Sequence, residues 1–322
     1  SSGPAHPHIC DISAFISLYD ILSKIIVQDV YHIKANLCKV TLIIREKRVQ
    51  QRNANIKHPK DIGVMPAQLG NPVAMTVANR DTQTLEMVRA SVSHKNVMLA
   101  YQPVVQAQNP NRIAFFEALI RVLDDTQRVI PAREFITVIE ETELGREIDC
   151  LALQKGLTAM VKVPNLRLSI NMSARSIAYR PWMQVLNRFL NQNPSLAERL
   201  ILEITERSTM LVPELVARFM SDLQARGISF ALDDFGAGHT AFRHFKQFHF
   251  DILKIDGQFI RNIAHDPDNQ VITQALVAIG QQFDMFTVAE CVETPAEVAW
   301  LQTLGIDCLQ GYHFGAPTLT PP

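Results

Sequence analysis

The feature that most constrains the fold is an alternation of short apolar runs with longer amphipathic segments over the last two thirds of the chain. Eight apolar runs have the length of strands: Leu99–Val105, Ala114–Val122, Leu166–Ser173, Leu200–Glu206, Ile228–Gly236, Asp251–Phe259, Met285–Thr294 and Cys308–Ala316. Helix-length segments separate most of these runs, among them Pro131–Val161, Pro213–Arg226 and Asn269–Phe283. Strands that alternate with helices predict βα units and a parallel sheet. The first two runs are joined only by Gln106–Arg112, which is too short for a helical crossover, so we expect them to pair antiparallel. The sequence therefore predicts an α/β fold, a TIM-like (β/α)8 barrel with an irregular antiparallel first strand.

The first 80 residues follow a different pattern, and we expect a helical N-terminal extension and linker at 1–80, followed by the barrel at 81–322. Apolar residues at helical spacing predict an amphipathic helix over Ala14–Val30. Prolines and glycines interrupt the stretch from His58 to Met75, which indicates a linker. Asp81 is expected to cap a short helix that leads into the barrel. The function of the extension is not indicated by its sequence.

Charge and cysteine content restrict the partners and the compartment. The net charge is −1, but the segment from Lys39 to Lys60 carries seven basic residues and one acidic one, so the rest of the chain is acidic at −7. Long nucleic acids are therefore not expected as ligands of the main body. Five scattered cysteines without a C-x-x-C motif predict neither a disulfide framework nor a zinc ribbon, which favours the cytoplasm. No apolar run reaches the roughly 18 residues of a membrane-spanning helix, so we expect no transmembrane span in this chain. Its apolar helix faces leave a homodimer as a candidate assembly.

Polar residues recur near the ends of the predicted strands, where a buried strand should be apolar. They are Glu117, Asn171, Glu203, Asp233, Asp234, Lys254, Asp256, Glu290 and Gln310. The C-terminal strand ends of an α/β barrel meet at one mouth, and this mouth carries the chemistry of such barrels. We therefore expect these side chains to lie together.

Six of these residues are carboxylates, and a single lysine cannot balance them. Two like charges about 5 Å apart repel by roughly 3 kcal/mol at an effective dielectric constant near 20. Divalent cations would neutralise the group at a lower cost than protonation at pH 7. Carboxylate and amide oxygens without Cys or His suit magnesium or manganese. The adjacent pair Asp233 and Asp234 is consistent with one bridging and one terminal ligand of a two-metal site.

Eight short motifs, taken together, resemble one known family. They are Tyr101-Gln102-Pro103, Glu117-Ala118-Leu119-Ile120-Arg121, Asn171-Met172-Ser173, Glu203-Ile204-Thr205-Glu206, Asp233-Asp234-Phe235-Gly236, Lys254-Ile255-Asp256, Ala289-Glu290-Cys291-Val292-Glu293 and Gln310-Gly311-Tyr312. In this order they resemble the EAL-domain cyclic di-GMP phosphodiesterases over residues 96–317. The resemblance implies metal-assisted hydrolysis of cyclic di-GMP to linear 5′-pGpG. Two departures from the family pattern are His239, where an aromatic tyrosine is usual, and Cys291, where glycine is common; neither replaces a metal ligand.

The resemblance also implies roles for individual residues. The metal ligands would be Glu117, Asn171, Glu203, Asp233, Asp234 and Glu290, with Asp233 shared between two Mg²⁺ or Mn²⁺ ions. The catalytic set would be Lys254, Asp256 and Glu290, with Lys254 and Asp256 orienting or deprotonating the attacking water. Gln102 and Arg121 would contact the cyclic dinucleotide. Glu206 and Glu293 would brace the loop after the fifth strand, Gln310 would support the water network, and Ca²⁺ would be inhibitory.

Two alternatives stay open on the sequence alone. A catalytically weak cyclic di-GMP receptor could use the same barrel. A retaining glycosidase could use Glu203 and Glu290 on the fourth and seventh strands, although this explains only two of the acids. A sugar site also usually contains aromatic platforms, and the chain has 2 Trp and 5 Tyr.

Overall fold

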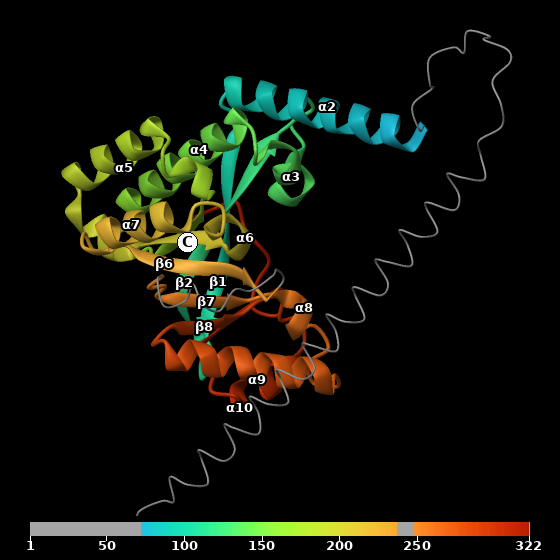
Figure 1. The fold of residues 1–322 in the computed structure, drawn as a ribbon, viewed down its shortest axis with the longest axis vertical. Coiled ribbons are helices and arrows are strands. Elements are labelled where there is room, and N and C mark those ends of the chain that lie inside the picture. The colour runs from blue at the N-terminus through green and yellow to red at the C-terminus, as the bar shows by residue number, and fades with distance from the viewer. Residues whose placement is uncertain (1–71, 237–247, 322) are drawn as a thin grey trace, which may run out of the picture. The chain divides into compact units, whose positions relative to one another are not determined.

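The computed structural model describes residues 72–236 and 248–321, which belong to one compact unit. The predicted helix Ala14–Val30, the predicted linker up to residue 71 and His239 lie outside the described residues. Figure 1 shows the strands in the interior with the helices around them.

Eight strands close into a barrel, as the alternating pattern predicts. They are β1 (Val97–Gln106), β2 (Asn109–Leu123), β4 (Leu168–Asn171), β5 (Leu200–Thr205), β6 (Ser229–Phe235), β7 (Ile252–Ile255), β8 (Phe286–Ala289) and β9 (Cys308–Gln310). Strands β2 and β4 to β9 pair parallel in chain order, and β1 closes the ring by pairing antiparallel with both β2 and β9. The two-residue turn between β1 and β2 forms the predicted antiparallel hairpin. The TIM-like barrel with an antiparallel first strand is thus confirmed.

One described strand was not predicted. Strand β3 (Val129–Pro131) pairs antiparallel with the far end of β2, outside the closed ring. It overlaps the start of the predicted helical segment Pro131–Val161. That segment also divides into the 3-10 helix η1 (Ala132–Glu134), α3 (Ile136–Ile139) and α4 (Glu143–Lys162). Gly145 allows the close approach of α4 to α3, because a Cβ there would lie 2.7 Å from the carbonyl oxygen of Ile139.

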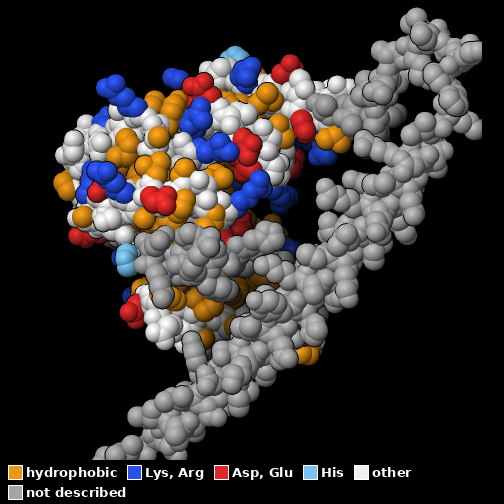
Figure 2. Space-filling model, viewed as in Figure 1, with side chains coloured by type: hydrophobic (Ala, Val, Ile, Leu, Met, Phe, Trp, Pro, Cys, Tyr) orange, Lys and Arg blue, Asp and Glu red, His pale blue; other side chains and the backbone are white. Residues whose placement is uncertain are grey.

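The remaining helices follow the strands. They are α5 (Arg180–Gln192), α6 (Glu206–Thr209), α7 (Pro213–Gln224), α8 (Gly257–Ile260), α9 (Pro267–Gln282) and α10 (Pro295–Thr303), with 3-10 helices η2 (Ala174–Ser176) and η3 (Pro194–Arg199). Helices α7 and α9 lie where the sequence predicts them. Over the described part of the face seen in Figure 2, acidic and basic side chains are interspersed among apolar ones. Among the described residues, no helix combines the length and the hydropathy that a membrane-spanning helix requires.

Helix α2 (Pro72–Ser93) is longer than the sequence predicts. It begins nine residues before Asp81, so the prediction of a short helix capped by Asp81 was wrong, and this residue lies exposed inside the helix. A proline is tolerated in the first turn of a helix, where backbone N–H groups have no intrahelical partner. The C-terminal part of α2 packs on the barrel through buried Val88 and through Ser91, whose Oγ donates a hydrogen bond to the carbonyl of Leu123 (2.7 Å).

The barrel interior is built in two layers because inward-facing residues recur every second position along a strand. The lower layer is an apolar cluster of Val104, Phe115, Ile201, Ala231, Ile252, Val288 and Cys308. The next inward-facing position, two residues further towards the same end of the barrel, carries a polar side chain on each strand, and we call this set the polar ring. It consists of Gln102, Glu117, Asn171, Glu203, Asp233, Lys254, Glu290 and Gln310, one from each barrel strand or the residue that follows it. The ring therefore rests on a floor of packed apolar side chains.

Candidate active site

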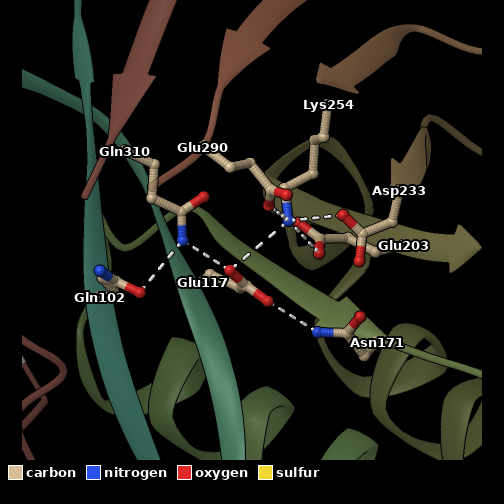
Figure 3. A network of polar contacts seen from close by, with 8 residues as sticks. All are labelled: Gln102, Glu117, Asn171, Glu203, Asp233, Lys254, Glu290 and Gln310. Atoms are coloured by element: carbon tan, nitrogen blue, oxygen red, sulfur yellow. Dashed lines mark hydrogen bonds and ion pairs between the residues drawn. The ribbon is translucent and has the colours of Figure 1, made fainter. Parts of the chain in front are cut away.

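Lys254 lies at the centre of the polar ring and is paired with four carboxylates (Figure 3). Its Nζ lies 2.8 Å from Oε1 of Glu290, 2.9 Å from Oε2 of Glu203 and 3.0 Å from Oδ1 of Asp233. A longer contact of 3.5 Å reaches Oε2 of Glu117. The lysine side chain is 1% exposed, so all four ion pairs are shielded from water. One buried ammonium group thus partly neutralises four acids that come from four different strands.

Two neutral amides of the ring hold Glu117 in place, and a third amide contacts one of them. Asn171 donates from Nδ2 to Oε1 of Glu117 (2.8 Å), and Gln310 donates from Nε2 to Oε2 (2.6 Å). Gln310 also donates to Oε1 of Gln102 at 3.3 Å. Burial raises the pKa of Glu117, but Lys254 and these hydrogen bonds outweigh it and hold this pKa below its ordinary value. Glu117 is therefore an oriented, ionised carboxylate.

The other acids carry more negative charge than the single lysine can balance. Burial raises the pKa of Glu203 well above its ordinary value, and the neighbouring carboxylates raise it further. For the same two reasons the pKa of Glu290 rises to about 8 and that of Asp234 to about 6. Burial alone would lower the pKa of Lys254, but the surrounding carboxylates raise it well above its ordinary value. Without a cation, protons must supply the missing positive charge.

A group of oxygen atoms beside Lys254 has the spacing and the chemistry of a divalent-cation site. Carboxylate oxygens of Asp233, Asp234 and Glu290 lie within 4.8 Å of one another. On the neighbouring strand β5, Oε1 of Glu203 is buried and has no hydrogen-bond partner among the described residues. All these donors are oxygen atoms, which suits a hard cation such as Mg²⁺ or Mn²⁺. The residues predicted to be metal ligands are thus brought together, whereas the sharing of Asp233 between two ions stays a prediction.

The residues predicted to bind substrate occupy different places. Gln102 is part of the polar ring, 9% exposed, and donates from Nε2 to the carbonyl of Gly315 at 3.3 Å. Arg121 lies four residues beyond Glu117 on β2, on the same face but outside the ring. Its Nη1 donates to the carbonyl of Ile120 (2.9 Å). Arg121 therefore lies further from the acids than Gln102, nearer the end of β2.

Asp256 caps a helix rather than joining the ring. It is the N-cap of α8, and its Oδ1 accepts a hydrogen bond from the backbone N–H of Gln258 at 2.7 Å. Its charge contributes to the raised pKa of Asp234, after burial and Asp233. The predicted role of Asp256 in orienting a water remains untested by this geometry.

The two predicted bracing residues differ in their surroundings. Glu206 is buried at the start of α6, and its Oε2 accepts a hydrogen bond from the N–H of Gly236 at 3.3 Å. Gly236 begins the loop after β6, which lies mostly outside the described residues. Glu293 is exposed, and none of the contacts found among the described residues involves its side chain. Glu206 thus holds the start of this loop, whereas the bracing role of Glu293 stays a prediction.

A pocket that the sequence does not reveal adjoins the polar ring. It encloses about 580 Å³ between β2, α3, α4 and α6. Three residues of the polar ring line this pocket: Glu117, Asn171 and Asp233. The helical side of the pocket is lined by residues that include Arg133, Thr137, Glu140, Asp149 and Arg207. The two arginines are exposed and lie on separate elements, η1 and α6. The carboxylates of the ring are therefore continuous with a cavity that has cationic side chains in its wall.

Asp149 is a buried acid of this pocket that sequence reasoning missed. Its Oδ2 accepts hydrogen bonds from the backbone N–H of Ser173 (2.9 Å) and from Oγ of Ser176 (2.6 Å). Burial raises its pKa to about 6, although both hydrogen bonds lower it. The signal was present in the sequence, because Asp149 is the charged residue within an otherwise apolar stretch of α4, from Ile148 to Leu153. Asp149 holds the segment that follows Asn171.

Cys291 has a backbone conformation that favours glycine. Its φ of 56° lies in the left-handed region, which disfavours residues with a Cβ. Its side chain packs on Gly257, where an added Cβ would lie 2.5 Å from Sγ of Cys291. Arg261 approaches the same sulfur, with Nη2 at 3.7 Å. Because Cys291 follows Glu290 and Gly257 follows Asp256, this contact joins two parts of the site.

Comparison with known proteins identifies the family. The sequence profile of the EAL domain matches residues 85–317. The signaling protein YkoW of Bacillus subtilis is 32% identical over 251 residues, which cover 76% of this chain and 31% of YkoW. The bifunctional diguanylate cyclase/cyclic di-GMP phosphodiesterase MucR of Pseudomonas aeruginosa is 31% identical, over 74% of this chain and 36% of MucR. The chain thus spans about a third of the length of these two relatives.

Solved structures agree with this comparison. The PaMucR phosphodiesterase in its c-di-GMP complex superposes with a TM-score of 0.67 at 30% identity, over 73% of this chain and 97% of that one. The Xanthomonas citri FimX EAL domain in complex with c-diGMP has a TM-score of 0.68 at 20% identity, over 77% and 98% of the two chains, and shows the shared fold. The retaining-glycosidase alternative finds no support among these relatives. With its profile match, its barrel and its motifs in order, the chain belongs to the EAL domain family.

Proposed function

We propose that this chain is a metal-dependent phosphodiesterase that hydrolyses cyclic di-GMP to linear 5′-pGpG. The observation that carries the proposal is the polar ring, in which buried carboxylates from separate strands surround one lysine. Membership of the EAL domain family supports the substrate, since MucR is named a cyclic di-GMP phosphodiesterase and PaMucR has been solved with c-di-GMP. The present chain keeps all the acids that the motifs of this family contain.

Charge balance favours two divalent cations over one. Five carboxylates, four around Lys254 together with Asp234, leave four negative charges after the ammonium is counted. Two divalent cations neutralise this excess. The ligands would be Glu117, Asn171, Glu203 and Asp233 for one ion, and Asp233, Asp234 and Glu290 for the other. When bound, such a pair lowers the pKa of a water molecule towards 7 and stabilises charge on the phosphoryl oxygens.

The chain's own residues would orient the substrate around this centre. Gln102 lies within the ring and can donate to a ligand oxygen, while Arg121 further along β2 can pair with a phosphate. The adjoining pocket is large enough for a nucleoside portion, and Arg133 and Arg207 in its wall offer planar donors to an anionic or nucleobase group. Glu206, through Gly236, would keep the end of β6 and thus Asp233 and Asp234 in position.

Product chromatography tests the proposal. Purified protein with cyclic di-GMP and Mg²⁺ should yield linear pGpG, and excess chelator should stop the reaction. Glu117→Ala and Asp233→Ala should each reduce turnover below a tenth of the wild-type rate, because each change removes a charged ligand. Glu86→Ala is the matched control, since this glutamate is exposed on α2 and should leave the rate unchanged.

Other outcomes would contradict the proposal in distinct ways. Binding of cyclic di-GMP with Mg²⁺ and no linear product over hours would indicate a receptor. Full activity of Asp233→Ala would remove the polar ring from the mechanism. Calcium should support little turnover, because it prefers longer and looser coordination than magnesium, and equal rates with both ions would contradict a tightly spaced pair.

A further inference from the structure

The ammonium group of Lys254 contacts three of the carboxylates that would also hold a cation. Three contacts of 2.8–3.0 Å join Nζ to one oxygen each of Glu290, Glu203 and Asp233. An ammonium group has three N–H donors; the contact to Oε2 of Glu203 has the geometry of a hydrogen bond, and those to Asp233 and Glu290 are close ion pairs. Figure 3 shows the lysine side chain extending into the middle of the ring, with the carboxylates directed at its Nζ.

We propose that Lys254 is an internal counter-ion that competes with divalent cations for the ring. Its ammonium fills the centre when no cation is bound, and it gives up most of its three short contacts when cations bind. This inference rests on the proposed metal-dependent function. It assigns to Lys254 a role in setting cation affinity, in addition to any contact it makes with water.

The geometry of the ring supports a competition for shared carboxylates. Asp233 and Glu290 each use an oxygen for Lys254, and both also belong to the group whose oxygens lie within 4.8 Å of one another. A magnesium-type cation needs carboxylate oxygens at about 2.0–2.1 Å in a strict geometry. A cation at that distance and an ammonium group on the same carboxylates would place two positive charges close together in a buried site. Simultaneous close contact of both with these carboxylates is therefore disfavoured.

The lysine can move only by rotating its side chain. The backbone of Lys254 is fixed in β7, in register with Val288 of β8, and β7 also pairs with β6. Its long, flexible side chain offers the required freedom, and Glu117 at 3.5 Å is a fourth, looser contact towards β2. Cation binding should therefore displace the ammonium without moving the strands.

Two consequences follow for the protein without cations. The ring would be held together by the ion pairs of Lys254, so removal of the ammonium leaves buried carboxylates without compensation. Removal of the ammonium should also free the oxygens for cations. Lys254 would therefore stabilise the cation-free protein and weaken cation binding at the same time.

The test compares Mn²⁺ binding in Lys254→Met with the wild type, measured by the electron paramagnetic resonance signal of free Mn²⁺. Methionine keeps an unbranched chain and removes the charge. Arg121→Met is the matched control, because it removes a positive charge near Glu117 without vacating any of the three short contacts. We expect Lys254→Met to bind Mn²⁺ at least about 10-fold more tightly than the wild type, because a positive charge that repels the ion is removed, and the control to change much less. In the presence of chelator, Lys254→Met should have a lower Tm than the wild type. Addition of Mn²⁺ should raise the Tm of Lys254→Met by more than it raises the Tm of the wild type.

Equal or weaker Mn²⁺ binding by Lys254→Met would overturn the inference while leaving the proposed function intact. An equal gain in Arg121→Met would also overturn it, because long-range charge would then explain the effect. If neither wild type nor variant binds Mn²⁺, the proposed function fails together with the inference. Should Lys254→Met not fold, ¹⁵N-lysine labelling of the wild type gives the answer: the protected ammonium resonance of Lys254 should shift or disappear on Mg²⁺ addition, and an unchanged resonance with bound Mg²⁺ would refute the displacement.

Discussion

Replacing Gly257 by alanine tests the packing between the start of α8 and the residue after Glu290. The added methyl carbon would lie 2.5 Å from Sγ and 2.6 Å from Cβ of Cys291, whereas carbon atoms in good contact lie about 3.5–4.0 Å apart. Overpacking of this kind costs about 1–3 kcal/mol of the free energy of unfolding. The third neighbour, the carbonyl oxygen of Glu290, is 3.8 Å away and does not clash. Cys291 alone is therefore responsible for the expected loss.

Cys291→Gly should remove that loss. It deletes both clashing atoms and relieves a φ of 56°, a conformation that costs a residue with a Cβ about 1–2 kcal/mol. Greater freedom of glycine in the unfolded chain offsets about 0.5–1 kcal/mol of this gain. Gly257→Ala should therefore be neutral or slightly stabilising in the Cys291→Gly background. The coupling energy between the two positions should be about 1–3 kcal/mol.

Urea unfolding of the wild type, both single variants and the double variant measures this coupling. The midpoints should move while the slopes stay constant, which indicates an unchanged extent of unfolding. The same loss of stability from Gly257→Ala in both backgrounds would refute the close contact and the position of Glu290 that depends on it. A destabilising Cys291→Gly would refute the argument from backbone conformation.

Three further predictions concern the same region. Asp149→Asn should flatten the pH dependence of the free energy of unfolding between about pH 4 and 6. The pKa of Asp149 in the folded protein, about 6, exceeds its ordinary value of 3.8, so its stabilising contribution is present below pH 4 and is lost as pH rises through 6. The free energies of unfolding of wild type and variant should therefore diverge by up to roughly 3 kcal/mol over that range. Divalent-cation binding should weaken as pH falls below about 8, because protons compete with the cation for Glu290 and then for Asp234. Calorimetry in buffers of different ionisation enthalpy should detect the protons released on binding, and an affinity that is constant from pH 8 to 6 would contradict the raised pKa values. Gly236→Ala should lower turnover more than tenfold. Gly236 has a φ of 94°, and a Cβ added there would lie 2.7 Å from Cε2 of Phe259, so the backbone beside Asp234 must shift. Unchanged kinetics would be incompatible with this geometry.

The barrel was predictable because its strands are buried on both faces and read as apolar runs separated by helices. Strand β3 was missed because three residues at the edge of β2 give no periodic signal. The early start of α2 was missed for a related reason, since much of its N-terminal part is exposed and shows no apolar stripe. Pro72 lies within the predicted linker His58–Met75, but the first turn of a helix accepts proline, and α2 begins there. Patterns of burial thus predict the elements that contribute to the core and miss those that do not.

The membership of the polar ring was largely predictable, but its internal contacts were not. Strand alternation places Glu203, Asp233 and Lys254 on inward positions, and this can be worked out from sequence spacing. Which oxygen meets the lysine depends on side-chain torsions and on the closure of the barrel, which spacing does not determine. For Asp256, the residue type and position also fit an N-cap, and the structure has this local hydrogen bond to Gln258.

The central claim is that the acids of the polar ring hold a pair of divalent cations, and the anomalous scattering of a crystal soaked in Mn²⁺ tests it most directly. The account predicts two anomalous peaks inside the ring, one among Asp233, Asp234 and Glu290 and one beside Glu117 and Glu203, with Asp233 in contact with both. Clear density for these side chains with no peak between them, at Mn²⁺ concentrations that support turnover, would contradict it.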